Sequence, residues 1–348
     1  MPASPVVNDD CTVTFRLEAP DADSVRIYAE FLDGPRLLER DDGGVWTVTI
    51  GPVEPDIYWY KFNVDGLSVL DPDNIFIHSS YNRSSLVLVP GERTRYLEER
   101  AVPHGTIHYH RYRSSQLDDD RGMYVYTPPG YSHNITARFP VLYLLHGYTD
   151  QEDEWMGTGR AQITLDNLIA EGKAAPMIVV MPNGYVPPRE GDSVNTGDPS
   201  ADWKHWFSQV TPRFDAHIIN EVVPFIDTAY RTMADSRHRA IAGLSMGGGQ
   251  TLYLGLKHPD MFGWICAFSS AVYTDVHSQF LDNPGELNMN IDLLWIGCGT
   301  DDFLFGNNMD FVTLLKEKDV RHVTHFTGGV HSWRVWRPYL FEVLQQLF

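Results

Sequence analysis

The sequence has little cysteine, no long apolar run and no excess of basic residues, and each shortage excludes a class of protein. Only three cysteines occur among 348 residues, so a disulfide framework like those of small secreted domains is not expected. No apolar run approaches the roughly 18 residues that a membrane-spanning helix needs. Lys and Arg number 27 against 46 Asp and Glu, and the net charge of −19 repels nucleic acid and anionic membrane surfaces.

Motifs for metals, cofactors and export are also missing. There is no H-E-x-x-H, no Walker loop and no dinucleotide fingerprint, so neither a metal nor a cofactor is expected. Residues 1–10 lack the basic and apolar regions of a signal peptide. The compartment is therefore left open, secreted or periplasmic if a signal was removed and cytoplasmic otherwise, and an oligomer is compatible with the sequence.

The first part of the chain alternates apolar and polar residues. A period of two, interrupted by turn residues, indicates half-buried antiparallel strands, and no helical period appears there. We therefore predict a small all-β, immunoglobulin-like sandwich over residues 1–95. Its predicted strands are 13–17, 25–29, 46–50 and 58–64.

A charged stretch between Pro90 and His104 marks the predicted domain boundary, and strands alternate with helices beyond it, over residues 96–348. Two of these strands are continuously apolar, as is typical of strands covered on both faces. The alternation predicts a mostly parallel, doubly wound sheet. The predicted strands are 106–112, 123–126, 141–145, 177–181, 239–244, 264–268, 293–297 and 323–326, and the predicted helices are 162–171, 214–230, one from 246 and 335–348.

A glycine-rich turn carries the strongest chemical signal. Gly243, Ser245 and Gly247 form a G-x-S-x-G match that follows a predicted strand and opens a predicted helix, the setting that this motif requires. A sharp strand-to-helix turn strains the serine backbone and leaves room only for glycine two positions before and after it. The motif predicts that Ser245 is a nucleophile, and a glycine-rich helix start is the alternative.

A serine hydroxyl becomes a nucleophile only when a base removes its proton, and a carboxylate orients that base. In this fold the chain order is Ser, acid, His. His331, in a glycine-flanked loop after the last predicted strand, is the predicted base, whereas His322 and His325 are predicted to be structural. The acid should follow the preceding strand, where spacing leaves Asp301 and Asp302 both open.

An oxyanion formed during acyl transfer needs two backbone N–H donors. One is expected from Met246 at the helix N-terminus and the other from Tyr148, where His146-Gly147 lets the backbone approach a substrate. His146 precedes the serine in sequence, so we predict a structural hydrogen-bonding role for it.

These segments, together with V-Y-T-P-P-G-Y, F-P-V-L-Y-L-L-H-G, C-G-T-D-D and G-G-V-H-S-W, resemble the esterase D-like group of carbohydrate esterase family 1. That group includes feruloyl, acetyl xylan and enterochelin esterases and mycolyltransferases. The resemblance covers roughly residues 100–348 and implies an α/β-hydrolase fold. It implies that Asp302 is the catalytic acid, because family members read G-T-x-D, and it supports Tyr148 and Met246 as oxyanion donors.

The N-terminal segments G-V-W-T-V-T-I, I-Y-W-Y-K-F-N-V-D-G and L-D-P-D-N resemble early-set domains related to family 48 carbohydrate-binding modules. Modules that bind starch use exposed tryptophans, and here only Trp59 clearly faces outward. Sugar binding and packing against the esterase domain are both compatible with this resemblance.

Substrate-binding residues are expected on two loops. Trp155 matches a family tryptophan after the H-G loop, with either pocket lining or packing as its role. Loop 184–206 contains Asp202, Trp203 and Trp206, which either contact substrate or pack within the loop.

The expected function is a serine esterase acting on hydroxycinnamoyl esters of plant cell-wall arabinoxylan, with an ester-bearing small molecule or oligosaccharide as its partner. An acetyl xylan esterase and an enterochelin-type siderophore esterase are the enzymatic alternatives. A carbohydrate-binding protein with an inactive esterase domain is the non-enzymatic one.

Overall fold

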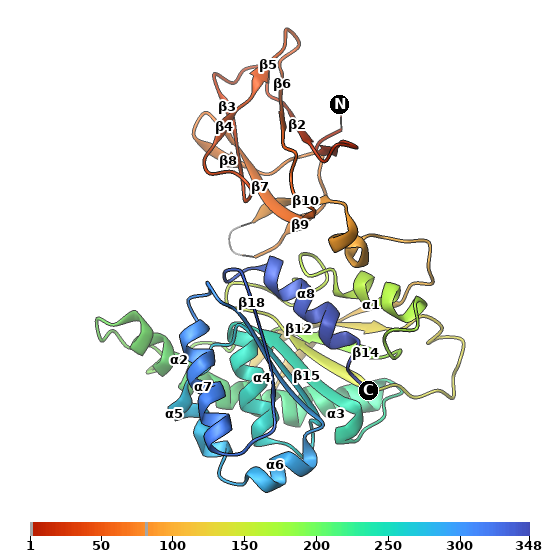
Figure 1. The fold of residues 1–348 in the computed structure, drawn as a ribbon, viewed down its shortest axis with the longest axis vertical. Helices are drawn as coiled ribbons and strands as arrows, with labels where there is room; N and C mark the ends of the chain where they lie inside the picture. The colour runs from red at the N-terminus through yellow and green to blue at the C-terminus, as the bar shows by residue number, and fades with distance from the viewer. Residues whose placement is uncertain (1–2, 81–82) are drawn as a thin grey trace. The chain divides into compact units, whose positions relative to one another are not determined.

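The computed structural model describes residues 3–80 and 83–348, and the chain divides into two compact units (Figure 1). The N-terminal unit comprises Met1–Arg100 and Met156–Thr164, and the α/β unit comprises Ala101–Trp155 and Leu165–Phe348. The charged stretch holds a short 3-10 helix, Glu92–Leu97, and the predicted boundary after residue 95 falls just before the chain enters the α/β unit.

The N-terminal unit consists of two antiparallel sheets whose inward side chains share one buried cluster, which confirms the predicted sandwich. The predicted alternation is seen in β3, where Val25, Ile27 and Ala29 are buried and the residues between them are exposed. One sheet has the order β1(Val6–Val7), β2(Val13–Glu18), β6(Val45–Ile50), β5(Glu39–Arg40). The other has the order β4(Arg36–Leu37), β3(Val25–Ala29), β7(Asp56–Val64), β10(Ser84–Val89), β9(Ile77–His78), and β8(Leu67–Val69) pairs with β7.

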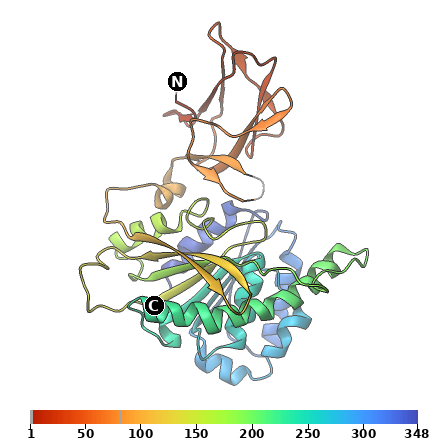
Figure 2. The ribbon, with the colours of Figure 1, turned by 180° about the vertical axis from the view of Figure 1, so that it is seen from behind.

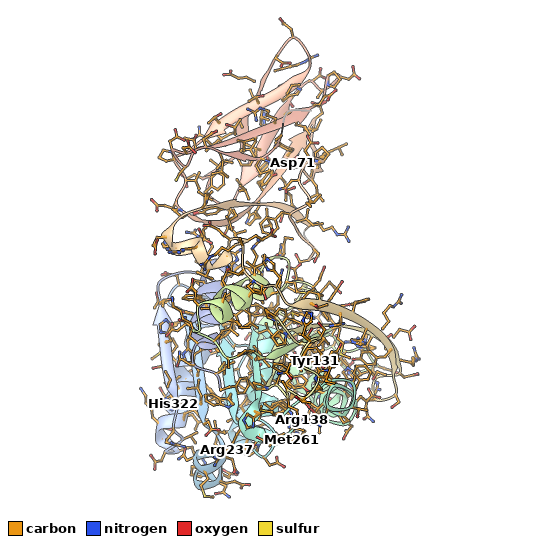
Figure 3. The ribbon with its side chains drawn as sticks, turned by 90° about the vertical axis from the view of Figure 1, so that its right-hand side faces the viewer. Asp71, Tyr131, Arg138, Arg237, Met261 and His322 are labelled. Carbon is orange, nitrogen blue, oxygen red and sulfur yellow. The ribbon has the colours of Figure 1, made fainter. Side chains whose placement is uncertain are left out.

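A buried carboxylate holds three parts of this sandwich together. Asp71, labelled in Figure 3, accepts hydrogen bonds of 2.7 Å from the hydroxyls of Tyr60 and Ser4, and its own N–H donates to Ser85 Oγ at 2.9 Å. Burial and the Asp71 charge raise the pKa of Tyr60, so its hydroxyl stays protonated and remains a donor. The L-D-P-D-N segment therefore has a structural role in this unit.

Trp59 lies on the outer face of β7 and is 39% exposed, as the sequence predicted. It lines a cleft of about 460 Å³ together with Tyr28, Lys61, Asn63 and other polar residues. Aromatic and hydrogen-bonding side chains of this kind suit a sugar, and sugar binding by this unit stays a prediction.

An eight-stranded sheet organises the α/β unit. β12 is antiparallel to both of its neighbours, and the other six strands after it in the sheet, β13 to β18, run parallel to one another, as predicted for a mostly parallel sheet. The order is β11(Thr106–Ser114), β12(Asp119–Thr127), β14(Ile178–Pro182), β13(Val141–Leu145), β15(Arg239–Leu244), β16(Trp264–Phe268), β17(Leu293–Gly299), β18(Val323–Thr327).

Helices cover both faces of this sheet, and α3 and α8 lie on opposite sides of it in Figures 1 and 2. Apolar residues of α2, α3, α4 and α7 share a core with one face of the strands. On the other face, Tyr339 of α8 packs against Phe268 and Trp295, with ring centroids 6.0 and 5.2 Å apart. The helices are α1(Ala161–Ala170), α2(Pro199–His217), α3(Val223–Ala229), α4(Met246–Lys257), α5(Thr274–His277), α6(Pro284–Asn290), α7(Phe305–Glu317) and α8(Trp333–Leu344).

Among the described residues, no helix combines the length and the apolarity that crossing a bilayer requires.

The prediction for residues 184–206 was partly wrong, because α2 begins at Pro199 and residues 199–206 are helical. The helix predicted over 214–230 therefore starts earlier, and it continues through a π-helical turn, Ile218–Val222, into α3. The sequence contains the start signal: Asp198 accepts a hydrogen bond from Ser200 N–H, and Pro199 occupies the first helical position.

Candidate active site

Ser245 lies at the sharp turn between β15 and α4, as the motif predicted. Its backbone has φ 53° and ψ −115°, a strained conformation for a residue with a side chain. Two hydrogen bonds stabilise this strained conformation. Ser245 N–H donates to the carbonyl of Phe268 at 2.9 Å, and the carbonyl of Ser245 accepts from Ala271 N–H at 2.8 Å. The turn is thus fixed by the neighbouring strand β16 and the loop after it.

The two glycines of the motif allow backbone segments to approach each other closely. A Cβ atom on Gly243 would lie 2.6 Å from the carbonyl oxygen of Gly247. A Cβ atom on Gly247 would lie 2.5 Å from the carbonyl oxygen of His146 and 2.6 Å from that of Leu145. Because real Cβ atoms do not come this close to other atoms, both positions require glycine.

Ser245, His331 and Asp302 form one chain of hydrogen bonds. His331 Nε2 lies 2.9 Å from Ser245 Oγ, and His331 Nδ1 lies 2.8 Å from Asp302 Oδ2 and 3.0 Å from Oδ1. Burial raises the pKa of Asp302, but hydrogen bonds from His331 and from Leu304 N–H outweigh burial and hold that pKa below its ordinary value. An ionised Asp302 keeps the proton of His331 on Nδ1, so Nε2 is left to accept the proton of Ser245.

The sheet topology explains how residues so distant in sequence meet. Ser245 follows β15, Asp302 follows β17, and His331 lies between β18 and α8. These strands are parallel, so their carboxyl ends share one edge of the sheet, and the loops that leave them are neighbours.

The alternatives to Asp302 and His331 have structural contacts instead. Asp301 N–H donates to Gly329 O at 3.0 Å, and its carboxylate accepts from Gly329 N–H at 3.3 Å, so Asp301 joins the two loops. His322 Nδ1 bonds the carbonyl of Val320 at 2.7 Å, and His325 lies 3.2 Å from the carboxylate of Glu342.

The loop that carries Tyr148 is held on both sides of that residue. Buried His146 donates from Nδ1 to Gly147 O at 2.8 Å and accepts from Gly184 N–H through Nε2 at 2.7 Å, in the structural role that was predicted. Burial lowers the pKa of His146, which keeps the ring neutral and able to make both bonds. On the other side, Thr149 N–H donates to the hydroxyl of Tyr185.

Two backbone N–H groups suit an oxyanion beside Ser245. Met246 is the first residue of α4, so its N–H has no partner within the helix. Gly147 passes close to the serine, since a Cβ atom built on it would lie 3.5 Å from Ser245 Cβ, and Tyr148 is the next residue. The oxyanion roles of Tyr148 and Met246 stay predictions.

Trp155 contributes to packing rather than to an open surface. The side chain is 1% exposed, and its indole N–H donates to Leu145 O at 2.9 Å. Its ring also contacts Trp333 of α8 and Phe268 of β16, at 5.0 and 6.2 Å between centroids. These contacts favour the packing alternative, and we no longer expect Trp155 to contact a substrate.

The residues singled out in loop 184–206 lie on the first turns of α2. Asp202 accepts from Thr196 N–H at 2.8 Å and from its hydroxyl at 2.6 Å, so it closes the loop before the helix. Trp203 and Trp206 lie against Tyr148, with ring centroids 4.6 and 5.8 Å from it. The structure thus brings both tryptophans, but not the Asp202 carboxylate, to the oxyanion loop.

The sequence analysis missed two aromatic residues at the imidazole of His331. Phe303 and Trp336 have ring centroids 4.5 and 4.9 Å from it, and Phe303 is 76% exposed. The position of Phe303, directly after the acid, is a sequence signal that would have placed it at the site.

Comparison with known proteins agrees with this geometry. Residues 114–347 match the esterase family, described as "Putative esterase". The chain is 32% identical to the endo-1,4-beta-xylanase/feruloyl esterase of Xylanibacter ruminicola over 99% of its own residues but only 46% of that protein. The chain therefore spans about half the length of this curated relative.

Two of the solved structures that resemble the chain show the extent of the likeness. A ferulic acid esterase is 26% identical and matches 70% of this chain and 98% of its own, with a TM-score of 0.60. The enterobactin esterase of Shigella flexneri matches 97% of this chain and 92% of its own with a TM-score of 0.67, but at 16% identity that likeness shows the fold alone. These matches confirm the α/β-hydrolase fold with a preceding β domain. The family match spans more than half of the residues of this chain, so this chain belongs to the esterase family.

Proposed function

We propose that this chain hydrolyses carboxylic esters through an acyl-enzyme, with Ser245 as nucleophile, His331 as base and Asp302 as the carboxylate that orients the base. One observation carries the proposal: His331 Nε2 lies 2.9 Å from Ser245 Oγ and His331 Nδ1 lies 2.8 Å from Asp302 Oδ2, while Ser245 is half-buried on a strained turn. The base needs a free ring nitrogen beside the serine hydroxyl, and the orienting carboxylate needs to contact the other ring nitrogen; His331 Nε2 and Nδ1 meet these two requirements.

In the first half-reaction, Ser245 Oγ forms a bond to the ester carbonyl carbon while its proton passes to His331 Nε2. The carbonyl oxygen becomes an oxyanion, to which the N–H groups of Tyr148 and Met246 donate in this proposal. The bond from that carbon to the alcohol oxygen then breaks. The imidazolium returns its proton to the departing alcohol, and the acyl group remains on Ser245.

In the second half-reaction, water replaces the alcohol. His331 takes a proton from the water as the water oxygen attacks the acyl carbon, and a second oxyanion forms at the same donors. The bond to Ser245 Oγ breaks and the serine regains its proton, so the products are one carboxylic acid and one alcohol. Asp302 stays ionised throughout and stabilises the imidazolium in both halves.

We propose hydroxycinnamoyl esters of plant cell-wall arabinoxylan as the substrates. The name of the Xylanibacter ruminicola relative supports this choice, since its similarity extends over nearly the whole chain. An acetyl xylan esterase would use the same residues on a smaller acyl group. An enterochelin-type esterase takes a strongly anionic substrate, which a chain of net charge −19 favours less.

The test compares wild type with Ser245→Ala on methyl ferulate, an acetyl ester and a triscatechol lactone. We expect wild type to hydrolyse methyl ferulate faster than the other two esters, and we expect Ser245→Ala to lose about 10⁶-fold in kcat. Undiminished hydrolysis by Ser245→Ala would refute the mechanism. A preference for the acetyl ester or the lactone would leave the mechanism intact and replace the proposed substrate.

A further inference from the structure

Three aromatic rings meet at the oxyanion loop and form what we call the aromatic corner: Tyr148, Trp203 and Trp206. Trp203 and Trp206 lie 4.7 Å apart with planes tilted by 33°. Tyr148 stands nearly perpendicular to both, at 84° to Trp203 and 75° to Trp206. Rings that meet at such angles form a corner in which a flat ring finds one face to stack on and one edge to contact.

The aromatic corner rests on fixed parts of the structure. Trp206 packs against the core beneath α2, and Tyr148 is also in contact with Tyr185, with centroids 5.8 Å apart. Tyr148 nevertheless keeps 49% of its surface exposed. The corner thus presents an aromatic surface to solvent while its rings pack against other residues, and such preorganisation favours binding.

The polar side chains on the same turns of α2 are occupied elsewhere. Asp202 accepts from Thr196, Lys204 Nζ donates to Asp275 at 2.6 Å, and His205 bonds Gly191 O at 3.0 Å. A sugar stacks on tryptophan rings but also needs hydrogen-bonding partners for its hydroxyls, whereas a phenyl ring needs only aromatic faces. Ring faces are what this surface offers, so it suits a planar aromatic group.

The position of the aromatic corner indicates which half of an ester it meets. The leaving alcohol must lie near His331, which protonates it, and the rings beside that imidazole are Phe303 and Trp336. The corner instead includes Tyr148, whose own N–H faces the carbonyl oxygen in the proposed mechanism. A group held there belongs to the acyl side of the bond.

From these observations we infer that the aromatic corner binds the aromatic ring of the acyl group, and that Trp203 and Trp206 make the chain selective for aryl-bearing acids over short aliphatic ones. The inference rests on the proposed function, because it assigns the acyl side from the roles of His331 and Tyr148.

The kinetic test uses two esters with the same alcohol, methyl ferulate and methyl butyrate. We expect Trp203→Ala to lower kcat/KM for methyl ferulate about tenfold, mainly through KM, and to change the value for methyl butyrate by less than about twofold. Trp203→Phe keeps a ring face and should recover most of the loss. Lys204→Ala, on the adjacent position but bonded to Asp275, is the matched control and should leave the ratio between the two esters unchanged.

A binding measurement separates this inference from the proposed function. Calorimetry with Ser245→Ala and the double variant Ser245→Ala/Trp203→Ala would measure the Kd of free ferulic acid without turnover, and we expect about tenfold weaker binding by the double variant. Equal affinities, or equal losses on both esters in Trp203→Ala, would overturn the inference. Absence of ester hydrolysis by wild type would refute the proposed function, while the calorimetry would still decide whether the corner binds the acid.

Discussion

The turn at Ser245 and the aromatic corner serve one reaction in the proposed mechanism, yet different features of the chain fix them. Backbone restraints define the turn. Ser245 has a positive φ, and two glycines lie so close to carbonyl oxygens that a Cβ atom would collide with them. Side chains alone make the corner, and Tyr148 and Trp203 come from segments that are distant in sequence. The position of the proposed nucleophile is thus encoded in a short motif, whereas the aromatic corner depends on contacts that only folding creates.

Apart from loss of the nucleophile itself, the largest expected effect is on the chemical side of this comparison. Asp302→Asn should lower kcat by about 10⁴-fold, because an amide does not hold the His331 proton on Nδ1 or stabilise the imidazolium. The loss should be the same for methyl ferulate and methyl butyrate, measured by steady-state kinetics. A loss confined to one ester would contradict the role given to Asp302, because orientation of the base does not depend on the acyl group.

Wild type and Asp302→Asn should also differ in how their free energy of unfolding depends on pH. The pKa of Asp302 is lower in the folded protein than in the unfolded chain, so its ionised form stabilises the fold above the unfolded value near 4. That stability is lost as the pH falls through the folded pKa. The difference in unfolding free energy between wild type and Asp302→Asn, from urea titrations, should therefore shrink below pH of about 4.

A second prediction concerns the backbone of the turn. Gly247→Ala should lower the free energy of unfolding by about 1–3 kcal/mol, because the new methyl group meets the carbonyl oxygens of His146 and Leu145. Displacement of Ser245 should also remove most activity on every ester. Gly306→Ala is the control, since nothing lies within 4 Å of that Cβ position in α7, and it should leave stability equal or raised. Equal stability in the two variants, measured by urea unfolding, would show that the close approach at Gly247 is not needed.

The smallest expected effect is at the loop before α2. Asp202→Ala should lower the thermal midpoint by only a few degrees, because the carboxylate holds Thr196 at an exposed position. The ratio of kcat/KM between methyl ferulate and methyl butyrate should not change. A changed ratio would mean that Asp202 contacts the acyl group, and it would weaken the distinction between loop-closing and substrate-binding residues of α2.

The strands were predictable from sequence where one rule governed them. Alternation located β2, β3, β6 and β7 in the sandwich, and continuous apolar runs located β13 and β14 in the large sheet. The first turns of α2 were missed because the residues before them are rich in Pro, Gly and Asp, as in a loop. Trp203 and Trp206 look like loop residues until the Asp198 cap and Pro199 are recognised as a helix start.

The candidate site was predictable to the extent that backbone strain restricts residue type. The G-x-S-x-G motif and the chain order located Ser245 and His331, but choosing Asp302 over Asp301 needed either a family resemblance or the observed contact with His331. Burial of Trp155 was not evident, because a tryptophan lines a pocket or fills a core with the same local sequence. Phe303 was missed because its position directly after the acid was not used as a signal, and the structure then showed its contact with His331.

Covalent labelling with a fluorophosphonate, followed by peptide mass spectrometry, tests the central claim most directly. The account predicts one adduct per chain on the Ser245 hydroxyl, none in Ser245→Ala, and greatly slowed labelling in His331→Ala. A wild-type protein that stays unlabelled while folded, or that carries its adduct on a different serine, would contradict the claim that Ser245 is the activated nucleophile.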